Sequence, residues 1–185
     1  MLTERLKFTY RNRFLPFIPQ ICLFAMTAVY TFFFSILSID RHNKLETSAF
    51  DLGINDQAIW QFAHFHTPFN TVRGLHTFGD HFTLINAMTS PLYWFANDVR
   101  ILLIFQSLVF AAGAVPLYLI AREYLKNQYL PLIFCFAYLM FPALHYVNLE
   151  DYHPEVFIPF FLLTAFYFII RKRQWPYLLF LFLTL

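Results

Sequence analysis

The sequence is poor in charge, glycine and cysteine. Only 13% of its 185 residues are charged and 59% are hydrophobic, whereas a soluble domain carries about a quarter charged residues. An ordinary soluble domain is therefore excluded, and a net charge of +2 offers no basic field for binding nucleic acid. Four glycines are too few for a glycine-rich phosphate loop. The only cysteines, Cys22 and Cys135, lie in apolar runs and predict no disulfide framework.

Long apolar runs take up most of the chain, which contains 26 phenylalanines. A helix needs roughly 20 apolar residues to cross the hydrocarbon core of a bilayer. Such runs predict transmembrane spans at residues 14–39, 101–121, 129–147 and 154–170. A fifth, truncated span at 175–185 is still apolar at the last residue, so we expect the N-terminal part of a longer protein. The predicted fold class is all-α, a polytopic transmembrane helical protein whose partner is the lipid bilayer.

The run at 82–96 is ambiguous, because about 15 helical residues rise only about 22 Å. If this helix does not cross the membrane, nine of the 13 Lys and Arg residues are cytoplasmic, as the positive-inside rule favours. Nine of the 11 acidic residues and all seven histidines then share the outer face. We therefore predict a multi-pass protein of the cell (inner) membrane, with a cytoplasmic N-terminus and acidic outer loops. A plainer alternative is that outer loops merely avoid basic residues.

The predicted outer loop at 40–100 is long, and long loops are usually functional or disordered. Its aromatic residues argue against disorder. Within 52–66, the apolar residues Ile54, Ala58, Phe62 and Phe65 recur at helical spacing. This spacing predicts an amphipathic helix that lies on the membrane surface, with its aromatic face in the headgroup region.

The first polar cluster of this loop holds Asp51, Asp56 and Gln57. Asp51 stands where an N-cap would, so its carboxylate has a purely structural use available. Asp56 follows after about 500° of helical turn, so the two carboxylates do not share a helix face. They converge on one site only if Asp51 belongs to the preceding loop.

Two further clusters combine Asp with His. Asp80 and His81 follow a glycine that allows unusual backbone angles, although Asp80 would also suit a cap for a helix starting near Phe82.

The third cluster lies at residues 150–155. In an extended segment Asp151 and His153 point the same way, a spacing that can bind a divalent cation. Glu155 is also explained by its place at a helix N-terminus. The candidate metal ligands are Asp80, His81, Asp151 and His153, and a divalent cation is the candidate cofactor.

These motifs resemble a family of uncharacterised bacterial and archaeal polytopic membrane proteins and, more distantly, the GT-C superfamily of membrane glycosyltransferases. The resemblance covers about residues 31–171 and rests on FDLGINDQ at 50–57, GDHF at 79–82, GAVPLYLIAR at 113–122 and DYHPE at 151–155. The sequence departs from the family pattern at Thr83 and Leu84, where a small polar residue and proline are usual, and at Asn55, where an apolar residue is usual.

The superfamily resemblance implies a GT-C-like fold with surface-lying helices in its first outer loop. It also implies transfer of a sugar from a polyprenyl-phosphate-linked donor to an acceptor on the outer face. Such a transfer needs a carboxylate general base. We expect Asp56 to be this base, with Asp51 as its closest rival. Substrate or metal contacts are expected from Asp80, His81, Asp151, His153, Glu155 and Gln57. The alternative is a non-catalytic membrane transport or accessory subunit, but the predicted spans hold almost none of the ionisable residues that a transport pathway requires.

Overall fold

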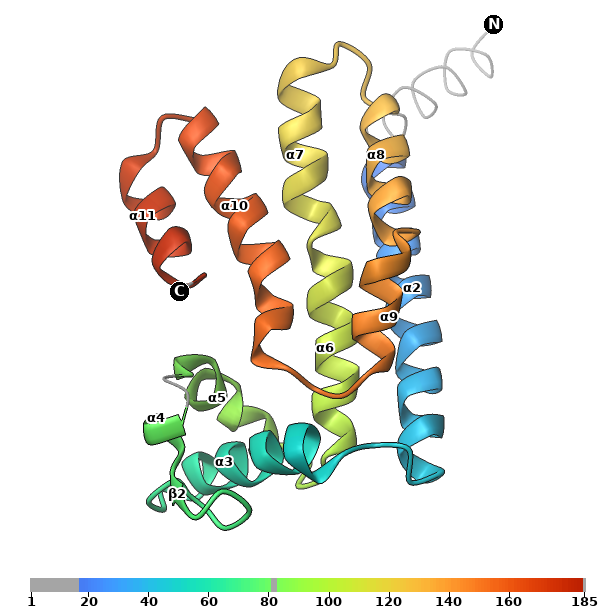
Figure 1. The fold of residues 1–185 in the computed structure, drawn as a ribbon. Helices are drawn as coiled ribbons and strands as arrows, with labels where there is room; N and C mark the ends of the chain where they lie inside the picture. The colour runs from blue at the N-terminus through green and yellow to red at the C-terminus, as the bar shows by residue number, and fades with distance from the viewer. Residues whose placement is uncertain (1–16, 81–82, 185) are drawn as a thin grey trace, which may run out of the picture.

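The computed structural model describes residues 17–80 and 83–184. Long helices form a bundle, and a layer of shorter helices lies across one of its ends (Figure 1). Within the described residues, β structure is limited to a hairpin of β1 (Phe69–Asn70) and β2 (Leu75–His76), paired antiparallel. The fold is therefore all-α.

Two of the described helices are long and apolar enough to cross a membrane. The first is α2 (Ile18–Asn43). The second runs from Arg100 to Tyr124 and consists of α6 (Arg100–Ala112) and α7 (Ala114–Tyr124), which meet at Gly113. A Cβ at Gly113 would overlap the hydroxyl of Tyr138, which donates a 2.9 Å hydrogen bond to the carbonyl of Phe110. A side chain at this junction would therefore have to displace the ring of Tyr138.

A bent pair of helices supplies a third candidate span among the described residues. Helices α8 (Leu130–Leu139) and α9 (Pro142–Leu149) meet at an angle of 44°. Proline disfavours helical geometry in the residue before it, and Phe141 is accordingly extended, with φ −71° and ψ 119°. The apolar run predicted at 129–147 is thus divided at Phe141.

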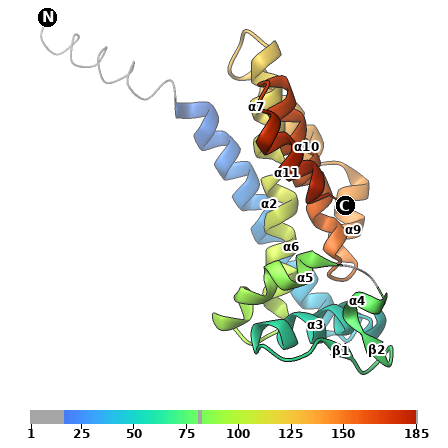
Figure 2. The ribbon, with the colours of Figure 1, turned by 90° about the vertical axis from the view of Figure 1, so that its left-hand side faces the viewer.

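The C-terminal helices form a hairpin beside the α6–α7 helix. A 3₁₀ turn, η4 (Pro154–Phe157), leads into α10 (Ile158–Ile170), and α11 (Gln174–Phe182) folds back along α10 (Figure 2). The rings of Phe168 and Phe180 stack with centroids 5.7 Å apart. Aromatic packing thus fixes α11 against α10.

The shorter helices make up what we call the loop layer, residues 49–94. It contains the π-helical turn η2 (Ala49–Gly53), α3 (Ile54–Ala63), the hairpin, α4 (Thr77–Asp80), α5 (Leu84–Thr89) and the 3₁₀ turn η3 (Ser90–Trp94). Helix α3 buries Ala58, Ile59 and Ala63, and it packs on α5 and η3. Phe65, predicted to continue the apolar face, lies beyond the helix and is 87% exposed. Apolar side chains lie on two adjacent faces of α3. The face that includes Ile59 packs on α5 and η3 and is therefore the buried one.

The two ends of the bundle differ in charge. The loop layer, including the segment 84–94, lies at one end, and the α7–α8 and α10–α11 turns lie at the other (Figure 1). Those turns carry Arg122, Lys126 and residues 171–173, and Arg171 forms a 3.1 Å ion pair with Glu123. The helical surface between these ends exposes large apolar side chains, among them Phe24 at 73% and Phe32 at 71%. A continuous apolar exterior of this kind is typical of membrane helices.

Candidate functional site

The candidate site is built around the segment 150–153, between α9 and η4, which crosses beneath the bundle. Tyr152 is completely buried in this segment. Gln106 of α6 donates a hydrogen bond to the carbonyl of Asp151 (3.1 Å) and accepts one from the backbone N–H of His153 (3.1 Å). The segment is therefore fixed by the buried amide of a membrane helix.

Asn55 joins the loop layer to this segment. Its side-chain amide donates to the carbonyls of Asp51 (3.0 Å) and Tyr152 (3.3 Å), and its oxygen accepts a 2.9 Å bond from the amide of Asn86. Asn55 thus links η2, α5 and the segment 150–153. It stands where the resemblance leads one to expect an apolar residue, so its role was not predicted.

A polar pocket of about 190 Å³ opens between these elements. Charged or titratable side chains line it from three directions: Asp51 from η2, Arg73 from the hairpin turn, and His153 and Glu155 from the η4 region. The remaining lining residues are Phe50, Ile54, Asn55, Asn70, Thr77, Thr83, Asn86 and Pro154. The pocket thus brings together residues of the first and third sequence clusters.

Arg73 and Asn86, both missed in the sequence, belong to this pocket. Asn70, only 1% exposed, accepts hydrogen bonds from the backbone N–H groups of Val72 (3.0 Å) and Arg73 (2.9 Å), which shapes the turn carrying Arg73. Asn86 is 2% exposed, and its side-chain oxygen has no hydrogen-bond partner within the described structure. A buried acceptor without a donor is costly, so this oxygen marks a polar position in the wall of the pocket.

Asp51 is not the helix cap that its position suggested. The N-cap of η2 is Ser48, whose hydroxyl accepts the N–H of Phe50 at 3.0 Å. Helix α3 then begins after Gly53, without any side-chain cap. The carboxylate of Asp51 instead lines the polar pocket.

Asp56 lies on another side of α3. Its carboxylate accepts a hydrogen bond from the hydroxyl of Tyr93 in η3, and it is not among the described residues that line the polar pocket. Burial raises the pKa of Asp56, and the negative charge of Asp98 raises it further, while the Tyr93 hydrogen bond lowers it. The structure therefore separates Asp51 and Asp56, in keeping with their spacing of five positions along the chain.

Asp151 and His153 also diverge. Asp151 is 5% exposed, and one carboxylate oxygen accepts the backbone N–H of Ser48 at 2.8 Å. Burial raises the pKa of this carboxyl, partly offset by the Ser48 hydrogen bond. His153 lines the pocket, whereas Asp151 lies behind it as a link to the start of the loop layer.

Gln57 has a structural partner. Its oxygen accepts the backbone N–H of Thr71 at 3.0 Å, and its amide donates to the hydroxyl of the same residue at 3.1 Å. Gln57 therefore holds the hairpin turn against α3.

The metal hypothesis named Asp80, His81, Asp151 and His153. Over residues 17–80 and 83–184, no three His, Cys, Asp or Glu side chains are grouped closely enough to hold a metal ion. His81 lies outside the described residues, and Asp80 is described only as the end of α4.

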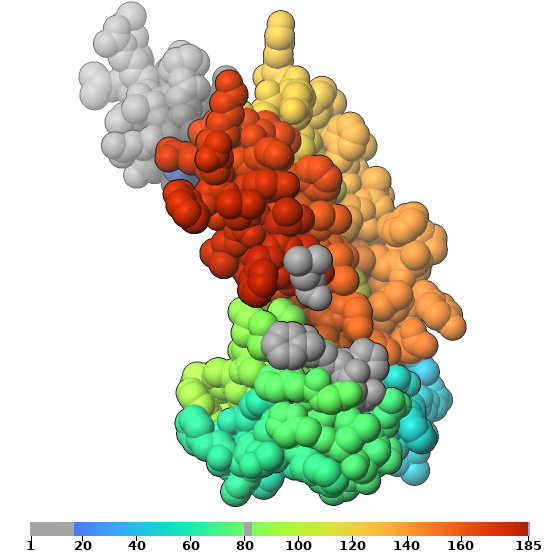
Figure 3. Space-filling view, turned by 60° about the vertical axis from the view of Figure 1, so that its left-hand side comes forward, coloured from blue at the N-terminus to red at the C-terminus, as the bar shows by residue number. Residues whose placement is uncertain are grey.

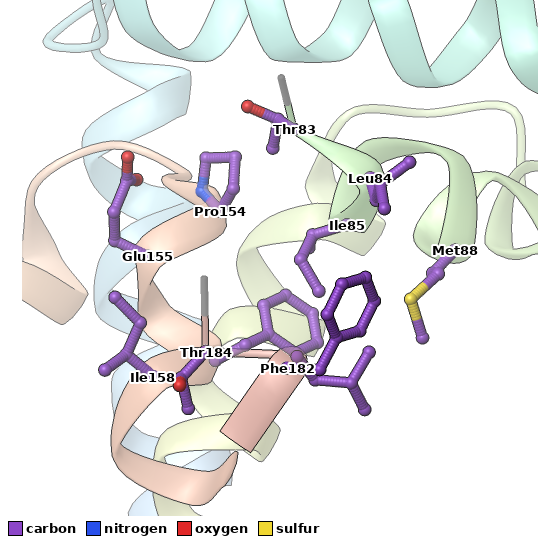
Figure 4. A pocket seen from close by; sticks show the side chains of 11 residues that line it. Thr83, Leu84, Ile85, Met88, Pro154, Glu155, Ile158, Phe182 and Thr184 are labelled. Carbon is purple, nitrogen blue, oxygen red and sulfur yellow. The ribbon is translucent and has the colours of Figure 1, made fainter. Parts of the chain in front are cut away.

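An apolar groove of about 230 Å³ adjoins the polar pocket. Its walls come from α5, from η4 and the start of α10, and from the end of α11, with Ile85, Ile158 and Phe182 facing the same space (Figure 4). The α11 end of the groove lies directly above the α5 region of the loop layer (Figure 3). Thr83, Pro154 and Glu155 line both the groove and the pocket, so the two spaces are neighbours that share these walls.

The bundle and its exposed apolar surface define a helical membrane protein. The family model described as predicted membrane protein (DUF2079) matches residues 41–185, and the chain belongs to this family. No curated protein and no solved structure matches the chain.

Proposed function

We propose that the protein is a membrane glycosyltransferase related to the GT-C superfamily, which transfers a sugar from a polyprenyl-phosphate-linked donor to an acceptor at the loop-layer end of the bundle. One observation carries this proposal: the polar pocket and the apolar groove share the walls formed by Thr83, Pro154 and Glu155. A lipid-linked sugar has a polar head joined to an apolar chain, and it needs two neighbouring spaces of this kind.

The polar pocket suits the head of such a donor. Arg73 provides a guanidinium for charge-assisted hydrogen bonds to a phosphate. The side chains of Thr77, Thr83 and Asn86, which line the same pocket, are the candidate hydrogen-bond partners of the sugar hydroxyls. The groove wall of Ile85, Ile158 and Phe182 contacts the first units of the lipid chain.

Asp51 is the better candidate for the general base. It lines the polar pocket beside His153, within reach of a ligand there. Asp56, the first choice from the sequence, is instead engaged by the hydroxyl of Tyr93 on another side of α3. In this proposal Asp51 accepts the proton of the acceptor hydroxyl, and His153 orients the donor phosphate.

The proposed orientation places the loop layer outside the cell. The turns carrying Arg122, Lys126 and residues 171–173 then face the cytoplasm, in keeping with the positive-inside rule. The donor head is thereby processed on the outer face of the inner membrane, and its lipid chain stays in the outer leaflet.

The test compares Asp51→Asn with Asp56→Asn in reconstituted vesicles supplied with a panel of polyprenyl-phosphate sugars. A general base typically contributes about 10²–10⁴ in rate, so Asp51→Asn should lose transfer by about that factor while donor binding is kept. Asp56→Asn should retain most activity. Loss in Asp56→Asn alone would return the base assignment to Asp56. The absence of transfer by the unmodified protein with every donor would favour an accessory or transport role.

A further inference from the structure

A second hollow lies at the opposite end of the bundle from the polar pocket. It has a volume of about 530 Å³ and is formed where α10 turns into α11. Its lining residues are Ile169, Lys172, Arg173, Gln174, Tyr177 and Leu178. The two consecutive basic residues Lys172 and Arg173 thus line the same hollow as the apolar side chains of Ile169 and Leu178.

Within residues 17–80 and 83–184, no acidic side chain forms an ion pair with the basic residues that line this hollow. Glu123 of α7 forms a 3.1 Å ion pair with Arg171 rather than with Lys172 or Arg173. Among the described residues, Lys172 and Arg173 form no ion pair, and both are exposed. The hollow therefore carries two unneutralised positive charges.

The backbone of the turn holds these two bases at the hollow. Lys172 has φ 54°, a left-handed conformation that glycine normally occupies at a helix end. The N–H of Lys172 bonds the carbonyl of Ile169 at 3.0 Å, and the N–H of Arg173 bonds that of Phe168 at 2.9 Å. These bonds fix the turn, with a lysine at a position whose backbone conformation a glycine would adopt at lower cost.

The start of α11 adds to the positive potential. The first turn of α11 contains no acidic residue, and Arg173 makes no side-chain cap. The positive end of the helix dipole therefore lies beside Lys172 and Arg173 without a counter-charge. The two basic side chains and the helix N-terminus would therefore stabilise a bound anion.

We propose that the α10–α11 turn binds the phosphate of an anionic phospholipid in the leaflet at this basic end. Lys172 and Arg173 hold the phosphate, and Ile169 and Leu178 contact the first part of an acyl chain. Trp175, 85% exposed beside the turn, is placed as membrane-interface tryptophans usually are. A lipid fits better than a soluble anion, because half of the hollow's lining consists of apolar or aromatic side chains. This site is separate from the proposed donor pocket.

The experiment measures phospholipid retention by native mass spectrometry of the purified protein, released from nanodiscs of mixed phosphatidylglycerol and phosphatidylcholine. Basic residues near a membrane surface each strengthen binding about fivefold. Lys172→Gln and Arg173→Gln should therefore each weaken phosphatidylglycerol retention by about that factor, and the double variant by about 25-fold. Lys126→Gln removes one charge from the other turn at the same end and serves as the matched control.

Equal loss in Lys126→Gln would mean a diffuse charge effect and would overturn the proposal. Equal retention of phosphatidylcholine by the unmodified protein would also contradict it. A third measurement compares inorganic phosphate with potassium chloride at the same ionic strength. If phosphate alone displaces phosphatidylglycerol, the ligand is a soluble anion and the lipid proposal is wrong. Glycosyl transfer is measured in parallel, and we expect the Lys172→Gln protein to retain it when it is supplied with donor.

Discussion

Asn55 provides the sharpest test of how the loop layer is held on the bundle. Asn55→Leu removes three hydrogen bonds, to Asp51, Tyr152 and Asn86, each worth about 0.5–1.5 kcal/mol net. The packing of the loop layer around Asn55, which includes one bond to the segment 150–153 through Tyr152, should weaken by about 2–4 kcal/mol. Local opening should then be about 30- to 700-fold more frequent.

Hydrogen–deuterium exchange in nanodiscs measures this opening directly. Faster exchange is expected in α5 and in the segment 150–153, while α10 should be unchanged, because it makes no contact with Asn55 in these hydrogen bonds. Asn127→Leu is the matched control: its side chain accepts only the nearby N–H of Tyr129, at the opposite end. Replacing both partners of a buried pair by apolar residues costs less than replacing one, so Asn55→Leu combined with Asn86→Leu should recover part of the protection. Unchanged exchange in the single variant would refute this account of Asn55.

Three further outcomes are expected. Gly113→Ala should lower the stability of the membrane bundle by about 1–3 kcal/mol through overpacking against Tyr138, and a Tm equal to that of the unmodified protein would contradict a close approach between Gly113 and Tyr138. Single cysteines at 98 and 124 should react with an impermeant maleimide from outside only at 98, and labelling at 124 instead would reverse the proposed orientation. Because the folded-state pKa of Asp56 is raised above its ordinary value of 3.8, its contribution to stability is fully present below pH 3.8 and is lost as pH rises through the raised pKa. Asp56→Asn should therefore flatten the loss of stability on moving from about pH 4 towards neutrality, and an unchanged profile would remove Asp56 as its source.

Much of the helical architecture follows from patterns that are visible in the sequence. Apolar runs of membrane-spanning length predict a helical membrane protein, and the family match and the bundle confirm this class. The break at Phe141 is signalled by Pro142, because proline acts on the residue before it. Because this effect acts between neighbouring residues, the break can be predicted without knowledge of the tertiary fold.

The site was harder to predict, because its organising side chains carry no titratable group. Asn55, Asn86 and Gln106 are amides, and an amide gives no sequence signal until its partners are known. The choice between Asp51 and Asp56 depends on where α3 starts and which of its faces is covered. Packing of α3 on η3 places Asp56 beside Tyr93, which no sequence pattern indicates.

Three hydrogen bonds hold the segment 150–153 through its main chain, in addition to the Asp151 carboxylate and the buried Tyr152 side chain. Gln106 and Asn55 donate to the carbonyls of Asp151 and Tyr152, and Gln106 also accepts the N–H of His153. These three bonds do not depend on the side chain at position 153, whereas the bond from the N–H of Ser48 depends on the carboxylate of Asp151. The side chain that lines the pocket at position 153 can therefore change while the main chain that carries it keeps its bonds to Gln106.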